Sequence, residues 1–322
     1  MLYLSADDIV EALSPDEVME AVQEALWIYE AKTYEMPERM SVPCGGGNLL
    51  LLMPCVAGDH IVTKLVSVFP GNPAQGRPVI DGLVVLYDRA TAEILALMDG
   101  KAITAMRTGA VTGVSVAHLS REGVTSVGLV GCGVQGYYQL LYACTVREIA
   151  RIVLYDIRPA ATASLAHRLR SENPGIEVEV ASSTAALLRA SDVVITATTA
   201  RTPVFPDDPD LFVGKHCVAI GSFEPDVREY PDALFSVVDW AWIDIDFARE
   251  ESGELKVPLA QGLLRDEQIE TLGHFIASGR SPERGAHGTT FSKSVGMALF
   301  DLTTARLAYT KARNEGLGTE LG

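Results

Sequence analysis

The sequence predicts an α/β protein that joins a doubly wound parallel sheet to an α+β domain with an antiparallel or mixed sheet. Strands and helices alternate from about residue 123 onward, whereas the four short β-like runs between residues 48 and 99 have no helix between them. A glycine-rich turn at 131–136 follows the first strand of the alternating part. Apolar strands that alternate with helices are typical of a parallel sheet buried on both faces.

The composition is that of a folded protein with an acidic surface. The chain has 322 residues, which corresponds to two domains at about 150 residues each. Hydrophobic residues make up 48% of it and charged residues 21%, which argues against disorder. The 26 basic and 42 acidic residues give a net charge of −16. Because such a surface repels phosphates and no Lys/Arg run offsets it, we expect no nucleic-acid partner.

Localisation signals and metal motifs are missing from the sequence. No apolar run approaches the roughly 18 residues that span a bilayer, and the first residues lack the pattern of a signal peptide. The 5 cysteines are an odd number without CxxC spacing, which indicates reduced thiols and a cytoplasmic location. The 6 histidines show no HxxxH or HExxH pattern, so we expect no zinc site.

Residues 1–118 are predicted to form the first domain. Ser14, Pro15 and Glu17 form a capping-box pattern that begins a helix. Four β-like runs separated by turn residues follow, at 48–54, 60–69, 79–88 and 93–99. With no helix between them, these strands pair in an antiparallel or mixed sheet. A helix is expected over 101–119.

Residues 119–295 are predicted to form the second domain, a Rossmann-type parallel sheet. Its strands are expected at 125–131, 150–156, 176–181, 192–199, 216–222 and 236–245. Helices are expected near 134–146 and 159–171, with a short one before residue 192. A long helical pattern covers 294–312, and we expect residues 296–322 to return to the first domain.

The turn Gly131-Cys132-Gly133-Val134-Gln135-Gly136 has the GxGxxG pattern of a dinucleotide-binding site. Gly131 permits the tight turn, Gly133 lets the backbone approach a pyrophosphate at the helix N-terminus, and Gly136 allows close helix packing. Asp156 ends the next strand, where its carboxylate can bind a ribose 2′-hydroxyl and repel a 2′-phosphate, so NAD is favoured. Arg158 could pair with that phosphate, which leaves NADP open. The alternative is a turn that only links strand to helix.

Further residues at strand ends are candidates for the cofactor cleft. Thr196, Thr198 and Gly221 follow two neighbouring strands, where α/β sites open, although the threonines could be ordinary strand residues. Glu224 and Asp226 flank a proline in the same region and are either a proton relay or a solvated turn.

Three cations stand in apolar or turn-like surroundings in the first domain. Arg39 lies in EMPERMSVP, Lys64 in VTKLVSVFPGNP, and Arg107 in DGKAITAMRTGA. A charged residue on a buried strand, as Lys64 is expected to be, needs a partner or a function. Arginines and lysines also hold carboxylates through charge-assisted hydrogen bonds. The alternative is that each is a surface charge or part of an internal ion pair.

These segments resemble the ornithine cyclodeaminase and mu-crystallin family over nearly the whole chain. The matching stretches include MPERMSVP, TKLVSVFPGNP, LALMDGKAITAMRTGAV, AIGSFEPDVRE and TTFSKSVGMALFD. The resemblance implies a Rossmann domain, a substrate domain that dimerises through its sheet, and hydride chemistry at a C–N centre of small amino acids. It also implies that Arg39, Lys64 and Arg107 hold the substrate carboxylate. By the same resemblance Ser292 and Lys293 border the nicotinamide.

Two positions depart from the ornithine cyclodeaminases within that family. Leu51, two residues before Met53-Pro54, stands where the cyclodeaminases have an acidic residue, and Phe223 stands where they have a catalytic aspartate. Neither side chain can bind or deprotonate an ammonium group. We expect Leu51, Met53 and Phe223 to form an apolar pocket wall, and the sequence is more similar to the ketimine-reducing mu-crystallin branch and to the alanine dehydrogenases.

The sequence therefore predicts a homodimeric, NAD-dependent oxidoreductase of the cytoplasm. It would reduce a small imino acid, or a 2-oxo acid plus ammonia, to an L-amino acid, with Lys64 as the proton donor to nitrogen. One alternative is an ornithine or lysine cyclodeaminase, an ammonia lyase that consumes and regenerates NAD. Another is a non-catalytic protein that binds a ligand together with a nucleotide.

Overall fold

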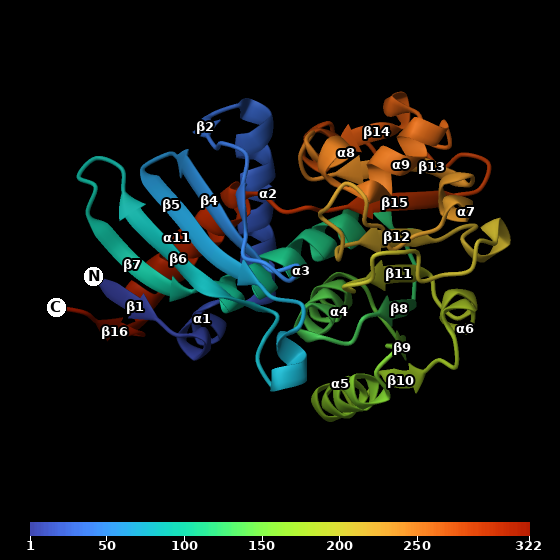
Figure 1. The fold of residues 1–322 in the computed structure, drawn as a ribbon, viewed down its shortest axis with the longest axis horizontal. Coiled ribbons are helices and arrows are strands. Elements are labelled where there is room, and N and C mark those ends of the chain that lie inside the picture. Colours follow the sequence, from blue (N-terminus) through green and yellow to red (C-terminus); the bar gives the residue numbers. More distant parts are fainter. The chain divides into compact units, whose positions relative to one another are not determined.

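The computed structural model describes residues 1–322, which form two compact units (Figure 1). Unit 1 combines Met1–Ala110 with Gly296–Gly322, and unit 2 comprises Val111–Val295. The division falls inside helix α3 (Gly100–Leu119), whereas the domain limit drawn from the sequence lies between residues 118 and 119, at the end of that helix. The assignment of a separate role to each domain stays a prediction.

Unit 1 contains a mixed eight-stranded sheet, as predicted. Its order is β16-β1-β7-β6-β5-β4-β2, and β3 also pairs with β4. β1 runs parallel to β7 and all other pairs are antiparallel. The strands are β1 (Leu2–Leu4), β2 (Tyr34–Glu35), β3 (Met40–Pro43), β4 (Leu49–Ala57), β5 (His60–Val68), β6 (Ile80–Asp88), β7 (Ile94–Asp99) and β16 (Thr319–Glu320). The four predicted runs correspond to β4, β5, β6 and β7. The strands β1, β2, β3 and β16 were not predicted because they span only two to four residues.

The helical elements of unit 1 are α1 (Ala6–Ala12), α2 (Pro15–Ala31), the first half of α3, α11 (Ala298–Glu315) and a 3-10 turn η1 (Asn72–Gln75). α11 and α1 pack directly against strands of the sheet, and α2 packs against α11. The predicted capping box begins α2, since the Ser14 hydroxyl accepts from the Glu17 N–H and the Glu17 carboxylate accepts from Ser14. α11 packs against β4, β5 and α2 (Figure 1). The C-terminal helix thereby closes the core of a sheet made by the first third of the chain.

The two faces of the sheet in unit 1 differ in burial. Alternate residues of β4 and β5 are buried, and these are the residues that face α11. The residues between them are apolar as well, apart from Thr63, but remain partly exposed. The exposed ones include Leu65, Leu83 and Ile94 on the central strands, and Met40 and Val42 on β3. One face of the sheet is therefore core, and the other is an uncovered apolar surface.

Unit 2 contains an entirely parallel eight-stranded sheet, as predicted for a doubly wound fold. Its order is β10-β9-β8-β11-β12-β15-β13-β14. The chain builds outward from β8 to β10 on one side and then continues from β11 on the other, so the topological switch point lies between β8 and β11. The strands are β8 (Ser126–Val130), β9 (Arg151–Tyr155), β10 (Glu177–Val180), β11 (Val193–Thr196), β12 (His216–Ala219), β13 (Val238–Ile243), β14 (Ile269–Thr271) and β15 (Thr289–Lys293).

The helices of unit 2 lie on both faces of its sheet (Figure 1). They are α4 (Val134–Val146), α5 (Pro159–Glu172), α6 (Thr184–Arg189), α7 (Asp232–Phe235), α8 (Ala248–Glu251), α9 (Gly253–Gln261) and α10 (Leu272–Ala277), with 3-10 turns η2 (Pro209–Leu211) and η3 (Asp266–Gln268). A continuous hydrophobic core includes Val127, Leu140, Ile152 and Val193.

The structure corrects the prediction at two places near the C-terminus. β15 was not predicted because its sequence TTFSK has one large apolar residue, although all five positions are buried. The helix expected over 294–312 begins only at Ala298. Residues 294–297 continue from the end of β15 into unit 1 without regular structure. Among the helices of the chain, none has both the length and the apolar character needed to cross a membrane.

Candidate functional site

Lys64 lies on β5 on the covered face of the sheet in unit 1. In the strand register it stands between Met53 of β4 and Val84 of β6, both buried. Its side chain is only 1% exposed, because β5 alternates its residues between the covered and the uncovered face. An ammonium group in such a place requires a partner of opposite charge.

That partner is Asp301 on α11, which is itself fully buried. Lys64 Nζ lies 2.7 Å from Asp301 Oδ2 and donates to Oδ1 at 2.9 Å. Arg107 of α3 donates to the same Oδ1 through Nε at 3.2 Å. Sequence reasoning missed Asp301. A buried Lys64 needs an acidic partner, and this need was the one indication that the sequence contained. The chain has 42 acidic residues, however, and Asp301 is 237 positions from Lys64.

Arg39 completes the cluster through the backbone of Gly296. Its Nη2 donates to the Gly296 carbonyl at 2.7 Å. Gly296 has a φ of +76°, and a Cβ there would lie 2.6 Å from Arg107 Nη1. The positive φ favours glycine at this position, and the missing Cβ leaves room for the Arg107 guanidinium. The structure brings the three predicted cations together around Asp301 and Gly296.

The surroundings of Lys64 lower its pKa to about 7. Burial is the largest cause, followed by the positive charge of Arg107, with a smaller contribution from Arg39. The charge of Asp301 and its hydrogen bond act in the opposite direction and favour the ammonium form. As a result, Lys64 can give up or accept a proton near neutral pH, which an ordinary lysine cannot do.

The predicted apolar residues fall into both units. Leu51 and Met53 are buried on β4 with their side chains on the same face as Lys64. Burial, reinforced by the negative charge of Asp301, raises the pKa of the neighbouring Cys55 thiol to about 12, so this thiol stays neutral. Phe223 belongs to unit 2, where it is half-buried in the segment that follows β12.

The glycine turn of unit 2 has the geometry of a pyrophosphate cradle. Gly131 adopts a φ of +101°, and a Cβ there would lie 2.5 Å from the carbonyl oxygen of Ala197. A Cβ on Gly136 would lie 2.2 Å from the carbonyl oxygen of Gly131. A Cβ on Gly133, in contrast, would meet nothing within 4 Å. The first and third glycines are thus required by packing, and the middle one leaves open space at the N-terminus of α4.

The first turn of α4 and the end of β9 border this space. Gly133 caps α4 without a side-chain hydrogen bond, so the first N–H groups of the helix can bind an anion. Val134 is 70% exposed there, and Gln135 is half-buried. Asp156 follows β9, and its carboxylate accepts from the N–H of Cys132 at 2.8 Å and from that of Arg158 at 2.8 Å. These bonds hold Asp156 beside the turn, and the residues present fit a dinucleotide.

The ends of β11 and β12 are held by Glu229, which the sequence did not single out. The hydroxyls of Thr196 and Thr198 both donate to its carboxylate, at 2.8 and 2.7 Å. The N–H of Gly221 donates to it at 2.8 Å. Thr196 is fully buried, so its hydroxyl faces the interior of unit 2. Glu229 stands next to Arg228 in the sequence DVREY, which reads as an ordinary surface charge pair.

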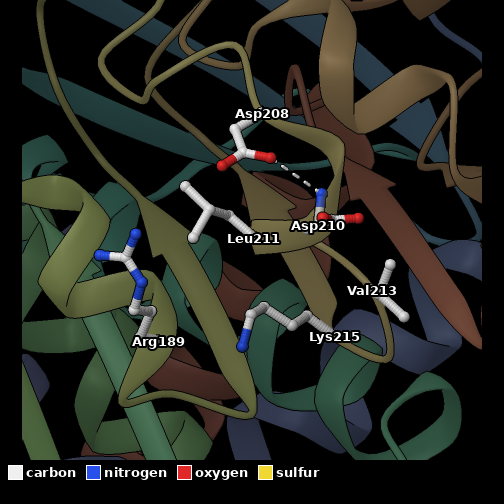
Figure 2. A pocket seen from close by; sticks show the side chains of 6 residues that line it. All are labelled: Arg189, Asp208, Asp210, Leu211, Val213 and Lys215. Atoms are coloured by element: carbon white, nitrogen blue, oxygen red, sulfur yellow. Dashed lines mark hydrogen bonds between the residues drawn. The ribbon is translucent and has the colours of Figure 1, made fainter.

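A separate pocket lies at the end of the unit 2 sheet where the strands begin, opposite the end that carries the glycine turn (Figure 2). Arg189 and Lys215 line it together with Asp208 and Asp210, and the Lys215 ammonium donates to the Ser191 carbonyl at 2.6 Å. Lys215 precedes β12, so this pocket is at the amino edge of the sheet, away from the glycine turn. Its two basic and two acidic residues balance, and it does not resemble an anion site.

Comparison with known proteins gives concordant matches over the whole chain. The model of the ornithine cyclodeaminase/mu-crystallin family matches residues 1–316. A Delta(1)-pyrroline-2-carboxylate reductase of Bacillus cereus is 32% identical, with 100% of this chain and 99% of the relative covered. The structure of the Thermococcus litoralis Delta(1)-pyrroline-2-carboxylate reductase in complex with NADH and L-proline is 32% identical, with 100% of both chains covered and a TM-score of 0.93. An archaeal alanine dehydrogenase dimer with bound NAD is 28% identical, covers 100% of this chain and 99% of its own, and has a TM-score of 0.89.

Proposed function

Because the chain belongs to the ornithine cyclodeaminase/mu-crystallin family, we propose that it is an NAD-dependent oxidoreductase that reduces a small cyclic imino acid to the L-amino acid. The observation that carries this proposal is the cluster of Arg39, Lys64 and Arg107 around Asp301 and the Gly296 carbonyl. The likeness to pyrroline-2-carboxylate and piperideine-2-carboxylate reductases supports a five-membered or six-membered ketimine as substrate. The likeness to alanine dehydrogenases supports a second candidate, a 2-oxo acid with ammonia.

The charges of the cluster suit a substrate carboxylate. Lys64 and Arg107 are both buried and share the single carboxylate of Asp301, which leaves one positive charge in excess between these three groups. Arg107 uses Nε for Asp301, which leaves its two terminal nitrogens to donate to another carboxylate. A carboxylate that leaves water needs several such charge-assisted donors. Once it is held, the adjacent imine carbon has a fixed position, and positioning supplies much of the rate.

The proton and the hydride come from different sources in this reaction. NADH, when bound, supplies the hydride to the imine carbon. Lys64 in its ammonium form donates a proton to the imine nitrogen, and its pKa of about 7 matches that role near neutral pH. Asp301 keeps enough positive charge on Lys64 for it to act as a donor.

The pocket wall favours an apolar ring over a side chain with a distal amine. Leu51 and Met53 are buried beside Lys64, and neither carries a negative charge that could pair with an ammonium group. Phe223, in the segment after β12, cannot act as a base. These residues speak against an ornithine or lysine cyclodeaminase.

The cofactor is NAD, held by the glycine turn and Asp156. Gly131, Gly133 and Gly136 shape the turn, and the carboxylate of Asp156 is fixed beside it. A fixed negative charge at this place favours a ribose 2′-hydroxyl over a 2′-phosphate. The NADH and NAD bound by the two similar structures support the same cofactor.

The uncovered face of the sheet in unit 1 is the proposed contact between two subunits. Leu52, Leu65 and Leu83 form one cross-strand row on this face, and Pro54 and Val85 belong to the next. An apolar face of this kind usually marks an interface. A second copy of the same chain is the proposed partner, as in the alanine dehydrogenase dimer. All five cysteines are free, which is consistent with a reducing cytoplasm.

A substrate panel tests the proposed reaction. With NADH, we expect pyrroline-2-carboxylate or piperideine-2-carboxylate to cause a loss of NADH absorbance, faster than pyruvate plus ammonia does. Ammonia release from ornithine and lysine in the presence of NAD is measured in parallel and should be absent. Ammonia release without net change in absorbance would instead identify a cyclodeaminase.

Substitution of Arg39 tests the carboxylate clamp. Arg39→Met removes one charge-assisted donor, so KM for the imino acid should rise about tenfold or more, while the Kd for NADH stays unchanged. Arg89→Met is the matched control, because Arg89 also donates to a glycine carbonyl in unit 1 but is exposed. An unchanged KM in Arg39→Met would remove Arg39 from the clamp.

The pH profile tests the role of Lys64. Because the donor must be protonated, kcat/KM for imine reduction should fall as the pH rises through about 7. Asp301→Asn removes a charge that raises the Lys64 pKa, so the midpoint should move to lower pH. Arg39→Met removes a charge that lowers it, so the midpoint should move to higher pH. A midpoint that stays constant in both variants would belong to the substrate and not to Lys64.

Light scattering coupled to size exclusion tests the dimer. The wild type should have twice the mass of one chain, and Leu83→Glu should shift it toward the monomer, because a charge would enter an apolar contact. Val10→Glu, at an exposed apolar position on α1, should leave the mass unchanged. A monomeric wild type would contradict the proposal.

A further inference from the structure

Two buried carboxylates in unit 2 take no part in the reaction described above. Glu229 and Glu254 are both fully buried, near the carboxyl ends of β11 and β12. Buried carboxylates are rare unless their oxygens are well supplied with hydrogen-bond donors. Their surroundings therefore indicate what they hold in place.

The Glu229 carboxylate joins two loops through four hydrogen bonds. Its Oε1 accepts from the N–H and the hydroxyl of Thr198, at 2.8 and 2.7 Å. Its Oε2 accepts from the hydroxyl of Thr196 and the N–H of Gly221, both at 2.8 Å. The Thr198 hydroxyl also accepts from the N–H of Ala200 at 3.1 Å, so it is engaged as donor and acceptor. One side chain thus fixes the loops after β11 and β12 to each other.

Only a carboxylate of this length satisfies both loops. The two oxygens face four donors, whereas a glutamine would place an NH₂ group against two of them. The contact is also close, because a Cβ on Gly221 would lie 2.6 Å from Glu229 Oε1 and 2.2 Å from the Thr198 carbonyl. A neutral amide at position 229 would therefore release one loop.

The carboxylate of Glu254, on α9, fixes the backbone at Glu229. It accepts from the N–H of Glu229, from the N–H of Tyr230 at 3.4 Å and from the Ser222 hydroxyl at 3.3 Å. Burial and the charge of Glu229 raise the pKa of Glu254 to about 7, and the charge of Lys293 partly opposes this. The chain of contacts runs from α9 through the backbone at Glu229 to both loops.

The order of the strands in the sheet indicates which half of a bound dinucleotide would lie over these loops. Asp156, after β9, marks the adenosine side, and the glycine turn after β8 marks the pyrophosphate. β11 and β12 follow on the other side of β8. The loops held by Glu229 therefore lie where the nicotinamide half extends from the pyrophosphate.

We propose that Glu229 is a positioning residue that holds the loops after β11 and β12 as a preformed seat for the nicotinamide half of NAD. This inference rests on the proposed function and deepens it. Glu229 does not touch the cofactor itself. It acts through Thr198 and Gly221, whose backbones it fixes.

Binding measurements with whole and truncated cofactor test this role. In fluorescence or calorimetric titrations, Glu229→Gln should weaken NADH binding about tenfold, because NADH must then order a loop that is already fixed in the wild type. The Kd for ADP-ribose, which lacks nicotinamide, should stay within about twofold of the wild type. Glu229→Asp keeps the charge but is one methylene shorter, so it should show the same selective loss and serves if Glu229→Gln does not fold. Asp232→Asn, in the half-buried Arg228–Asp232 ion pair of the same segment, is the matched control and should bind both ligands normally.

Each other result has a distinct meaning. Equal weakening of NADH and ADP-ribose in both Glu229 variants would make Glu229 a general support of unit 2 and overturn the proposal. Unchanged NADH binding would also overturn it, and would leave the proposed reaction intact. A wild type that binds neither ligand would contradict the proposed function and this inference together, since neither measurement depends on turnover of an imino acid.

Discussion

The buried carboxylate of Asp301 is the constraint on which the candidate site of unit 1 depends. It neutralises Lys64, which is almost fully buried, and also accepts from Arg107. Without it, two cations would remain in the interior with no counter-charge, at a cost of several kcal/mol. Because Asp301 lies on α11, the C-terminal helix is needed for the chemistry as well as for the core.

Unit 2 uses its buried carboxylates in a different way. Asp301 accepts hydrogen bonds from charged donors, and its negative charge raises the pKa of Lys64. Glu229 meets neutral N–H and O–H donors, and its effect is to fix the ends of two strands. The first arrangement controls where a proton resides, whereas the second controls where a ligand can lie. The burial of either carboxylate costs free energy, and both carboxylates lie beside the segments expected to carry the reaction.

The sheet of unit 1 serves two purposes because its strands alternate. Lys64 and Met53 point toward α11 and form the charged and apolar walls of the site. Leu65, the next residue along β5, points the other way and contributes to the uncovered apolar face. A shift of one residue in register would exchange these roles. The proposed substrate pocket and the proposed subunit contact therefore depend on the same strand pairing.

The sequence alone determined the features that depend on local periodicity and local chemistry. These were the long strands and helices, the glycine turn from Gly131 to Gly136, and the choice of Arg39, Lys64 and Arg107 as unusual cations. It could not find β15, whose burial comes from its neighbours and not from its own composition. Only the tertiary structure selected Asp301 and Glu229 from the 42 acidic residues. Their partners are remote in the chain, and nothing in a carboxylate's own segment states which distant donors will enclose it.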